Sequence, residues 1–250
     1  MQTVNWLFLF QCLTHLSLVP MIVYGNWYHW LIAVTVYFFT GSIGMSGTYH
    51  RLLSHKSYKT LRIWEIIGTT LATIGGTGSS IAWCAVHRAH HRYTDTPQDP
   101  HCPHHLGWWR VQFFSMFYQP NIKYVPDLLR DKFHVNMHKY YWAVHLIYAV
   151  ALYLLDPFAV VYAWLIPSMI LWHAGSGVNT LGHMWGWQDH KLNKDSSTNH
   201  PVLGLLMWGE GWHNNHHAFP QDYRFGQKWW QIDMTRYLIE LVKVKDKNVT

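Results

Sequence analysis

The first 50 residues of the chain contain no lysine, arginine, aspartate or glutamate. A helix of about 17–25 mainly apolar residues is long enough to cross the hydrocarbon of a bilayer. Four stretches of about that length occur, at approximately residues 4–24, 27–49, 139–155 and 157–181. Charged residues make up only 13% of the sequence, a low fraction for a soluble protein. The sequence therefore predicts an all-α membrane protein with four transmembrane helices.

A fifth apolar stretch, at about residues 61–83, is expected to lie on the membrane surface or to re-enter rather than to cross. It contains Glu65 and the glycine- and serine-rich run 75–80. Irregular backbone is tolerated at membrane depth only where it is buried in protein or faces water. A full crossing would also place the histidines before and after it at opposite membrane faces. We therefore expect residues 84–138 and 184–250 to form one helical cap, and the whole chain 1–250 to be a single domain.

The basic residues predict on which side this cap lies. All 19 lysines and arginines fall within residues 51–62, 88–139 and 191–247, and none lies in the links near Gly25 and Asp156. Because lysine and arginine in short loops mark the cytoplasmic face, both termini and the cap are expected to be cytoplasmic. The N-terminal stretch lacks the basic start of a signal peptide and is expected to be retained. The cations are too scattered to predict nucleic-acid binding.

Three histidine strings occur at this surface, in residues 50–55, 87–91 and 213–217. In the second and third strings the spacing i, i+3, i+4 places three imidazoles on one helix face. Asn179 and His183 end the fourth transmembrane stretch, four residues apart and at the same surface. Ten donors exceed the coordination number of one ion, so two metal ions are predicted. The candidate ligands are His50, His55, His87, His90, His91, Asn179, His183, His213, His216 and His217.

The kind of donor indicates the metal. Imidazole suits zinc, copper, iron and nickel. The chain has only three glutamates, too few for a carboxylate-rich di-iron bundle, and it lacks the HExxH motif of hydrolytic zinc sites. A redox-active pair fits a mainly imidazole shell better. We expect two iron ions, with no catalytic residue beyond their ligands.

The ordered segments HRLLSH, HRAHH, NTLGH and GEGWHNNHHAFP resemble those of the membrane fatty-acid desaturases, in particular the delta-9 acyl-CoA type of stearoyl-CoA desaturase. The resemblance covers most of the chain. It implies that nine histidines, and a water linked to Asn179, hold two irons. It also implies that dioxygen is used to introduce a cis double bond into a saturated acyl chain.

Carboxylates and aromatic residues near the strings complete the expected site. A carboxylate that accepts a hydrogen bond from a metal-bound imidazole fixes the orientation of that ring. The candidates are Glu210, Asp99 and Asp95, with Asp222 and Asp233 also available. The acyl channel is expected to be lined by Trp83, Phe38, Phe39 and Ser46. The last three follow the face of His50 upstream at helical spacing, and Phe38 or Phe39 is expected to close the channel and set the chain length.

The expected partners are membrane lipids, dioxygen, an acyl substrate and an electron donor. Acyl-CoA is preferred over acyl-lipid or acyl carrier protein, although Cys84, Ala85 and Val86 replace the charged residues that accompany the carrier in the animal acyl-CoA enzymes. Only 33 residues follow His217, too few for a fused cytochrome b5 domain, so a separate ferredoxin, rubredoxin or cytochrome b5 is expected. Two alternatives stay open: a hydroxylase or ketolase of the same superfamily, and a non-catalytic membrane protein that binds metal or haem.

Overall fold

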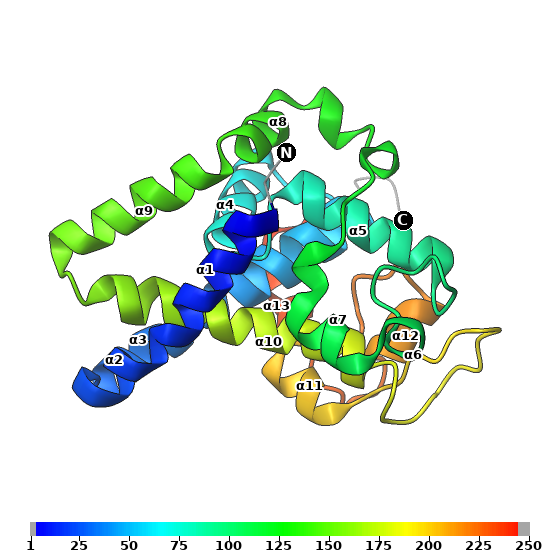
Figure 1. Cartoon of the computed structure of the whole chain (residues 1–250). Coiled ribbons are helices and arrows are strands. Elements are labelled where there is room, and N and C mark those ends of the chain that lie inside the picture. The colour runs from blue at the N-terminus through cyan, green and yellow to red at the C-terminus, as the bar shows by residue number, and fades with distance from the viewer. Residues whose placement is uncertain (1–3, 245–250) are drawn as a thin grey trace.

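The computed structural model describes residues 4–244, which form helices joined by turns and loops, with no strand longer than an isolated bridge among them (Figure 1). The α-helices are α1 (Val4–Leu16), α2 (Leu18–Tyr24), α3 (Trp27–Phe38), α4 (Arg62–Ile74), α5 (Ser80–Tyr93), α6 (Pro103–Leu106), α7 (Trp108–Phe114), α8 (Lys132–Lys139), α9 (Tyr141–Leu155), α10 (Ile166–Leu181), α11 (Pro201–Leu206), α12 (His213–Ala218) and α13 (Met234–Val242). Two segments are π-helical, η1 (Phe39–Ser54) and η5 (Val161–Leu165), and three are short 3₁₀ turns, η2 (Ser115–Phe117), η3 (Ile122–Tyr124) and η4 (Leu128–Arg130).

Two long hairpins extend to the same end of the molecule (Figure 1). The first joins α1 and α2 to α3, and the second joins α9 to η5 and α10. Two helices are long and apolar enough to cross a membrane, Trp6–Tyr24 and Trp27–Ser54, while Tyr141–Leu155 is apolar but shorter. The all-helical prediction is therefore confirmed for the described residues. Trp6–Tyr24 and Trp27–Ser54 are candidate spans, and the four crossings stay a prediction.

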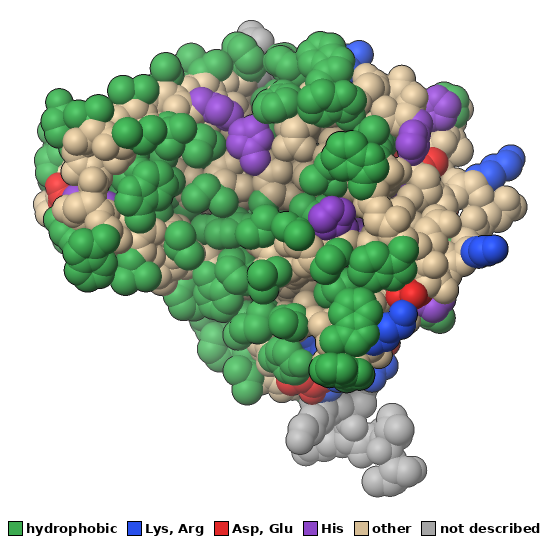
Figure 2. Space-filling model, turned by 90° about the horizontal axis from the view of Figure 1, so that it is seen from below, with side chains coloured by type: hydrophobic (Ala, Val, Ile, Leu, Met, Phe, Trp, Pro, Cys, Tyr) green, Lys and Arg blue, Asp and Glu red, His purple; other side chains and the backbone are tan. Residues whose placement is uncertain are grey.

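The surface of both hairpins is strongly apolar. Ile22, Trp27, Ile147 and Leu155 are 67%, 77%, 70% and 83% exposed. Figure 2 shows hydrophobic side chains spread over this end of the molecule, and lysine and arginine gathered toward the opposite end. Contiguous apolar surface of this extent is rare on monomeric soluble proteins. It is the surface that contact with lipid requires.

The second candidate membrane helix changes its geometry partway along. After Phe38 the backbone adopts the wider π-helical turn and continues to Ser54, five residues beyond the predicted end at 49. The hydroxyls of Thr48 and Ser54 donate to carbonyls five residues back, those of Ile43 and Tyr49. In a π-helix, residues five apart rather than four apart lie on the same face. This change in spacing decides which side chains lie on the same face of η1 as His50.

The stretch 61–83 turns back on itself. Helix α4 runs antiparallel to η1 at very close range, because a Cβ on Gly44 would lie 2.6 Å from the backbone nitrogen of Ala72 and one on Gly68 would meet Thr48. A turn follows, with Gly76 and Gly78 at positive φ, and α5 begins at Ser80 with Ser79 as its N-cap. The chain thus leaves the end of η1 that carries the first histidine string, and α5 brings the second string back to that end. A site shared by the two strings requires this arrangement.

Candidate metal centre

Nine histidines from four parts of the chain converge in one region of the structure. They come from η1 and the residue after it, from α5, from the residues after α10 and from α12. Their donor atoms form two sets, in each of which all nitrogens lie within 4.8 Å of one another. The five-histidine group is His50, His55, His87, His91 and His216, and the four-histidine group is His90, His183, His213 and His217.

The imidazoles in each group point their Nε2 atoms at one another. In the five-histidine group the Nε2–Nε2 distances are 3.0 Å for His50–His216 and 2.8 Å for His55–His87. In the four-histidine group the Nε2 of His213 lies 3.0 Å from that of His183 and 3.1 Å from that of His217. Ligands held about 2.0–2.1 Å from one cation come this close to each other. The buried Nε2 of His90 has no hydrogen-bond partner among the described residues, so both groups fit a metal.

Carboxylates contact four of these rings at Nδ1, on the side of the ring away from Nε2, and so fix the orientation of the ring. Nδ1 of His90 lies 2.8 Å from Asp99, and Nδ1 of His217 lies 2.8 Å from Asp195. Nδ1 of His183 lies 3.3 Å from Asp95, and Nδ1 of His50 lies 2.5 Å from Glu210. An imidazole that donates from Nδ1 to a carboxylate presents the lone pair of Nε2 to the metal. The lone pairs at the centre of each group would repel one another without a cation between them.

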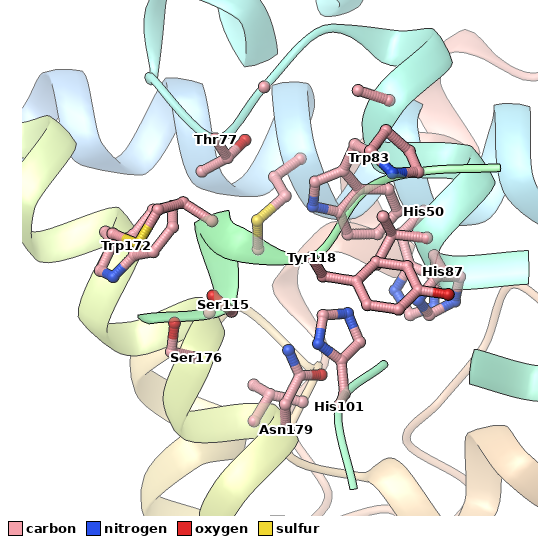
Figure 3. Close-up of a pocket in the computed structure, with 18 of the residues that line it drawn as sticks. His50, Thr77, Trp83, His87, His101, Ser115, Tyr118, Trp172, Ser176 and Asn179 are labelled. Atoms are coloured by element: carbon pink, nitrogen blue, oxygen red, sulfur yellow. The ribbon is translucent and has the colours of Figure 1, made fainter. Parts of the chain in front are cut away.

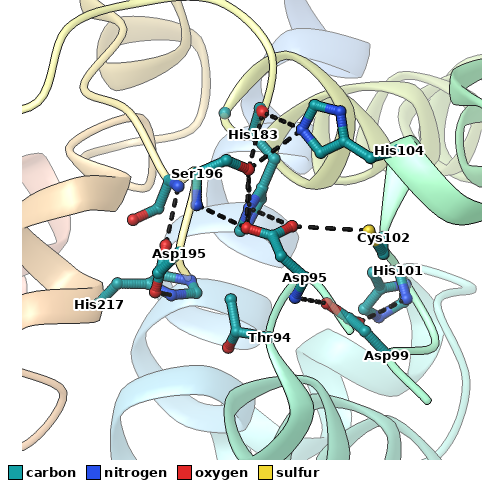
Figure 4. A network of polar contacts seen from close by, with 12 residues as sticks. Thr94, Asp95, Asp99, His101, Cys102, His104, His183, Asp195, Ser196 and His217 are labelled. Carbon is teal, nitrogen blue, oxygen red and sulfur yellow. Dashed lines mark hydrogen bonds and ion pairs between the residues drawn. The ribbon is translucent and has the colours of Figure 1, made fainter. Parts of the chain in front are cut away.

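The structure brings three of the expected carboxylates, Glu210, Asp99 and Asp95, to these rings. Asp222 instead pairs with Arg224, and Asp233 with Arg51. Asp195 was not foreseen, because it lies in the loop between α10 and α11, 22 residues before its partner, and no helical spacing links the two. Figure 4 shows how this loop is held: Ser196 donates to Asp95 through its backbone nitrogen and its hydroxyl, at 2.6 and 2.7 Å.

The protonation states of the histidines and carboxylates favour metal binding at both groups. Burial, followed by the charges of neighbouring imidazoles, lowers the pKa of six of the histidines well below the ordinary value: His55, His87, His91, His213, His216 and His217. Burial raises the pKa of the Glu210 and Asp99 carboxyls, but their hydrogen bonds and charge interactions with His50 and His90 outweigh it, so each pKa is lowered. The centre therefore presents neutral imidazoles backed by ionised carboxylates. This donor set suits a transition metal.

The two groups differ in their surrounding charge. Glu210, behind the five-histidine group, also pairs with Arg51, which is fully buried, pairs with Asp233 at 2.9 Å and lies 3.8 Å from the Phe225 ring centre. The four-histidine group has three carboxylates behind it, Asp95, Asp99 and Asp195. No lysine or arginine within residues 4–244 pairs with any of these three. The four-histidine group is thus the more negative environment.

A cavity of about 410 Å³ adjoins the metal centre, within the size range of small-ligand sites. Figure 3 shows Trp172, Ser176 and Asn179 on its α10 side and Trp83, His50 and His87 across from them. Trp83 stacks on His87 with ring centroids 4.9 Å apart. Leu7 of α1 also reaches the cavity, and no lysine or arginine lines it among the described residues. Asn179 shares the wall with His213.

Phe38, Phe39 and Ser46 lie outside this cavity. Phe38 packs edge-on against Trp208, Phe39 is 43% exposed, and the Ser46 hydroxyl donates to Glu210. The expectation assumed α-helical spacing, whereas five-residue spacing from His50 reaches Met45, which does line the cavity. Of the four residues expected to line the acyl channel, Trp83 lines this cavity, and the substrate roles of all four stay predictions.

Comparison with known proteins identifies the family. The fatty acid desaturase family model matches residues 25–242. The chain is 34% identical over 227 residues to the sn-2 palmitoyl-lipid 9-desaturase of Nostoc sp. (strain 36), covering 86% of this chain and 75% of that protein. It is 31% identical over 219 residues to the sn-1 stearoyl-lipid 9-desaturase of Anabaena variabilis, with coverages of 85% and 80%. It is also 31% identical over 229 residues to the acyl-CoA C20 Delta5-desaturase of Anemone leveillei, with coverages of 87% and 72%. This chain belongs to the fatty acid desaturase family.

Proposed function

We propose that the chain is a multi-pass membrane desaturase that introduces a cis double bond at position 9 of a saturated fatty acyl chain. The observation that carries the proposal is the convergence of nine buried imidazoles, Nε2 to Nε2, in two groups beside a cavity. The nine histidines would hold two irons, with Asn179 placing a water at the four-histidine group. A reduced iron pair with dioxygen supplies an oxidant strong enough to remove hydrogen from an unactivated methylene.

The protein's own part is to position groups and to exclude water. Asp95, Asp99, Asp195 and Glu210 hold ring orientations from Nδ1. Trp83 stacks on His87 and forms a rigid wall at the point where the cavity meets the centre. The remaining walls, from the turn 75–80, α5 and α10, are mainly apolar and would hold an acyl chain extended past the two groups.

The acyl carrier in this proposal is a membrane lipid, with CoA as the second candidate. The phosphates of CoA call for cations near the mouth of the site, and the cavity wall has none among the described residues. Cys84 and Ala85, at the positions where the animal acyl-CoA enzymes have charge, are fully buried against Val125 and Leu128. Two of the relatives described above are named as lipid 9-desaturases, which supports both the carrier and the position.

The topology in this proposal has four crossings, with the metal centre and both ends of the chain on the cytoplasmic side. The two hairpin links lie at the end of the molecule away from the nine clustered histidines, and neither has a lysine or arginine (Figure 1). Electrons would come from a separate carrier protein on the cytoplasmic side. Both assignments rest on the distribution of basic residues.

Fatty-acid analysis of a desaturase-deficient host that expresses the chain tests the proposal. We expect a new cis-9 mono-unsaturated acid in the membrane lipids, and its loss in a His90→Asn variant that still inserts. His190→Asn, on the surface loop, is the matched control. Purified protein in bilayers, reduced with dithionite and then exposed to dioxygen, should convert stearoyl phosphatidylcholine and leave stearoyl-CoA unchanged; the reverse preference would refute the lipid carrier alone. Hydroxy acids, or no product from reduced, iron-loaded protein, would refute desaturation.

A further inference from the structure

The desaturation proposed above consumes electrons that the acyl substrate does not supply. Two C–H bonds break and one C=C bond forms, so the acyl chain gives up two hydrogens, and two electrons and two protons from outside complete the reduction of dioxygen to two waters. The electrons must therefore enter through the protein surface. The following inference rests on the proposed function and concerns where they enter.

The metal centre comes closest to the surface on one side. His91 and His217 are the only members of the two groups that are not fully buried residues. Their rings stack, with centroids 4.5 Å apart and planes at 28°, although they belong to different groups. The His217 side chain is only 1% exposed, so the surface lies directly above its backbone. An electron that arrives here meets both groups at once.

Three exposed cations lie in the segments next to this position. Arg92 follows His91 in the chain, and Lys194 precedes Asp195, the carboxylate that contacts His217 at 2.8 Å. Lys191 follows His190, whose backbone nitrogen donates to Asn214 on α12 at 2.8 Å. Phe219, 50% exposed and 5.1 Å from the His190 ring, supplies an apolar contact in the same area. In Figure 1 the loop with both lysines lies beside α12 and the end of α5.

None of these three cations forms an ion pair with a carboxylate of residues 4–244, unlike the other cations nearby. Arg224 pairs with Asp222, and Lys228 pairs with Asp189. The carboxylates of Asp95 and Asp195 contact His183 and His217 rather than these three side chains. Figure 2 shows lysine and arginine side chains projecting from the end of the molecule away from the apolar hairpins, so a lipid surface is not the natural partner.

We propose that Arg92, Lys191 and Lys194, around Phe219, form the docking surface for a small acidic protein that carries one electron at a time. A patch of one charge steers a partner of opposite charge into a short-lived complex, and such steering raises association rates by about 10 to 1,000-fold and weakens with salt. Electron-transfer complexes are small and transient. Three cations around one aromatic residue match that kind of interface.

Charge reversal tests this surface. The variant Arg92→Glu/Lys191→Glu/Lys194→Glu is compared with Arg130→Glu/Lys132→Glu/Lys139→Glu, which reverses three exposed cations around η4 and α8 that form no ion pair within residues 4–244. Iron-loaded protein in bilayers is reduced anaerobically by plant-type [2Fe–2S] ferredoxin and, separately, by the soluble domain of cytochrome b5. We expect the second-order rate with at least one of these probes to fall about tenfold or more at low salt in the first variant, and the difference from wild type to vanish near about 0.5 M NaCl.

The control variant should follow wild type at every salt concentration. The docking surface would be overturned by any of three results. These are reduction rates equal to wild type in both variants, an equal fall of the rate in both variants, or a fall in the first variant that salt does not remove. Iron content and single turnover after dithionite reduction should be unchanged in all three proteins, because dithionite needs no docking. If dithionite-reduced wild type forms no unsaturated product, the proposed function fails, whatever the result with ferredoxin.

Discussion

Glu210 links the metal centre to the most deeply buried charges of the protein. Its carboxylate accepts from His50, from the Ser46 hydroxyl and from Arg51, and Arg51 is held in turn by Asp233. Removing one member of a buried charged network leaves the others without compensation. A substitution that keeps the shape of Glu210 and removes only its charge therefore isolates the effect on His50, because Arg51 keeps Asp233.

Glu210→Gln is expected to weaken metal binding at the five-histidine group by about 10 to 100-fold, the usual effect of losing a partner behind a metal-bound histidine. Iron per chain is measured during chelator titration, with Mössbauer spectra to count the remaining sites. One iron should be lost early and one retained. Glu240→Gln, on the surface of α13, is the control. Retention of both irons at wild-type chelator concentrations would contradict the assignment.

Asp195→Asn is expected to have the complementary effect. The amide oxygen can still accept from His217, so only the charge is lost, and the four-histidine group should lose affinity by about 10 to 100-fold. Asp222→Asn, at a carboxylate paired with Arg224, controls for surface charge. Because the two carboxylates serve different groups, the losses in Asp195→Asn and Glu210→Gln should add in the double variant. If both variants release the same iron, the division into two groups is wrong.

At the scale of helices, residue spacing could be predicted only where the helix is α-helical. The i, i+3, i+4 pattern identifies His87, His90 and His91 on α5 correctly as neighbours, because α5 has ordinary geometry. The same rule selects Phe39 and Ser46 as companions of His50 and overlooks Met45, because η1 is π-helical. A π-helix gives no periodic signal that a single sequence reveals. Asp195 could not be predicted either, since a loop brings it to His217.

The close contact between α4 and η1 positions the first two histidine strings relative to each other. A Cβ on Gly44 would lie 2.6 Å from the backbone nitrogen of Ala72, which cannot move without shifting α4. Gly44→Ala is therefore expected to lower the free energy of unfolding by about 1–3 kcal/mol through overpacking, and to lower iron content with it. Thermal unfolding in detergent and iron analysis measure both.

Gly177→Ala provides the matched control within a buried helix. Its added Cβ would lie 3.6 Å from the nearest atom, Cδ2 of Leu203, which is ordinary contact. Alanine is also favoured over glycine in a helix interior by up to about 1 kcal/mol. This variant should therefore unfold at or above the wild-type temperature. Equal stability of Gly44→Ala and wild type would show that α4 and η1 tolerate separation.

At the scale of the molecule, the sequence predicts the helical class, the approximate limits of the apolar segments and the family, because each follows from local composition or motif. The exact depth of each crossing does not follow in this way. Helix α9 has 15 residues and is about 22 Å long at 1.5 Å per residue, short of the roughly 30 Å of hydrocarbon. The second hairpin is thus the part of the topology that needs a direct test.

Cysteine labelling provides a direct test of whether the second hairpin crosses the membrane. In a Cys12→Ser background the remaining thiols, Cys84 and Cys102, are fully buried. Tyr24→Cys and Leu155→Cys mark the two hairpin ends, and Trp229→Cys marks the segment between α12 and α13; the parent side chains are 74%, 83% and 95% exposed. With a membrane-impermeant maleimide on sealed vesicles of known orientation, positions 24 and 155 should be labelled from one side and 229 only from the other. The lack of lysine and arginine in both links predicts this result. Labelling of 155 from the same side as 229 would show that α9 and α10 do not cross, and would reduce the membrane domain to the first hairpin.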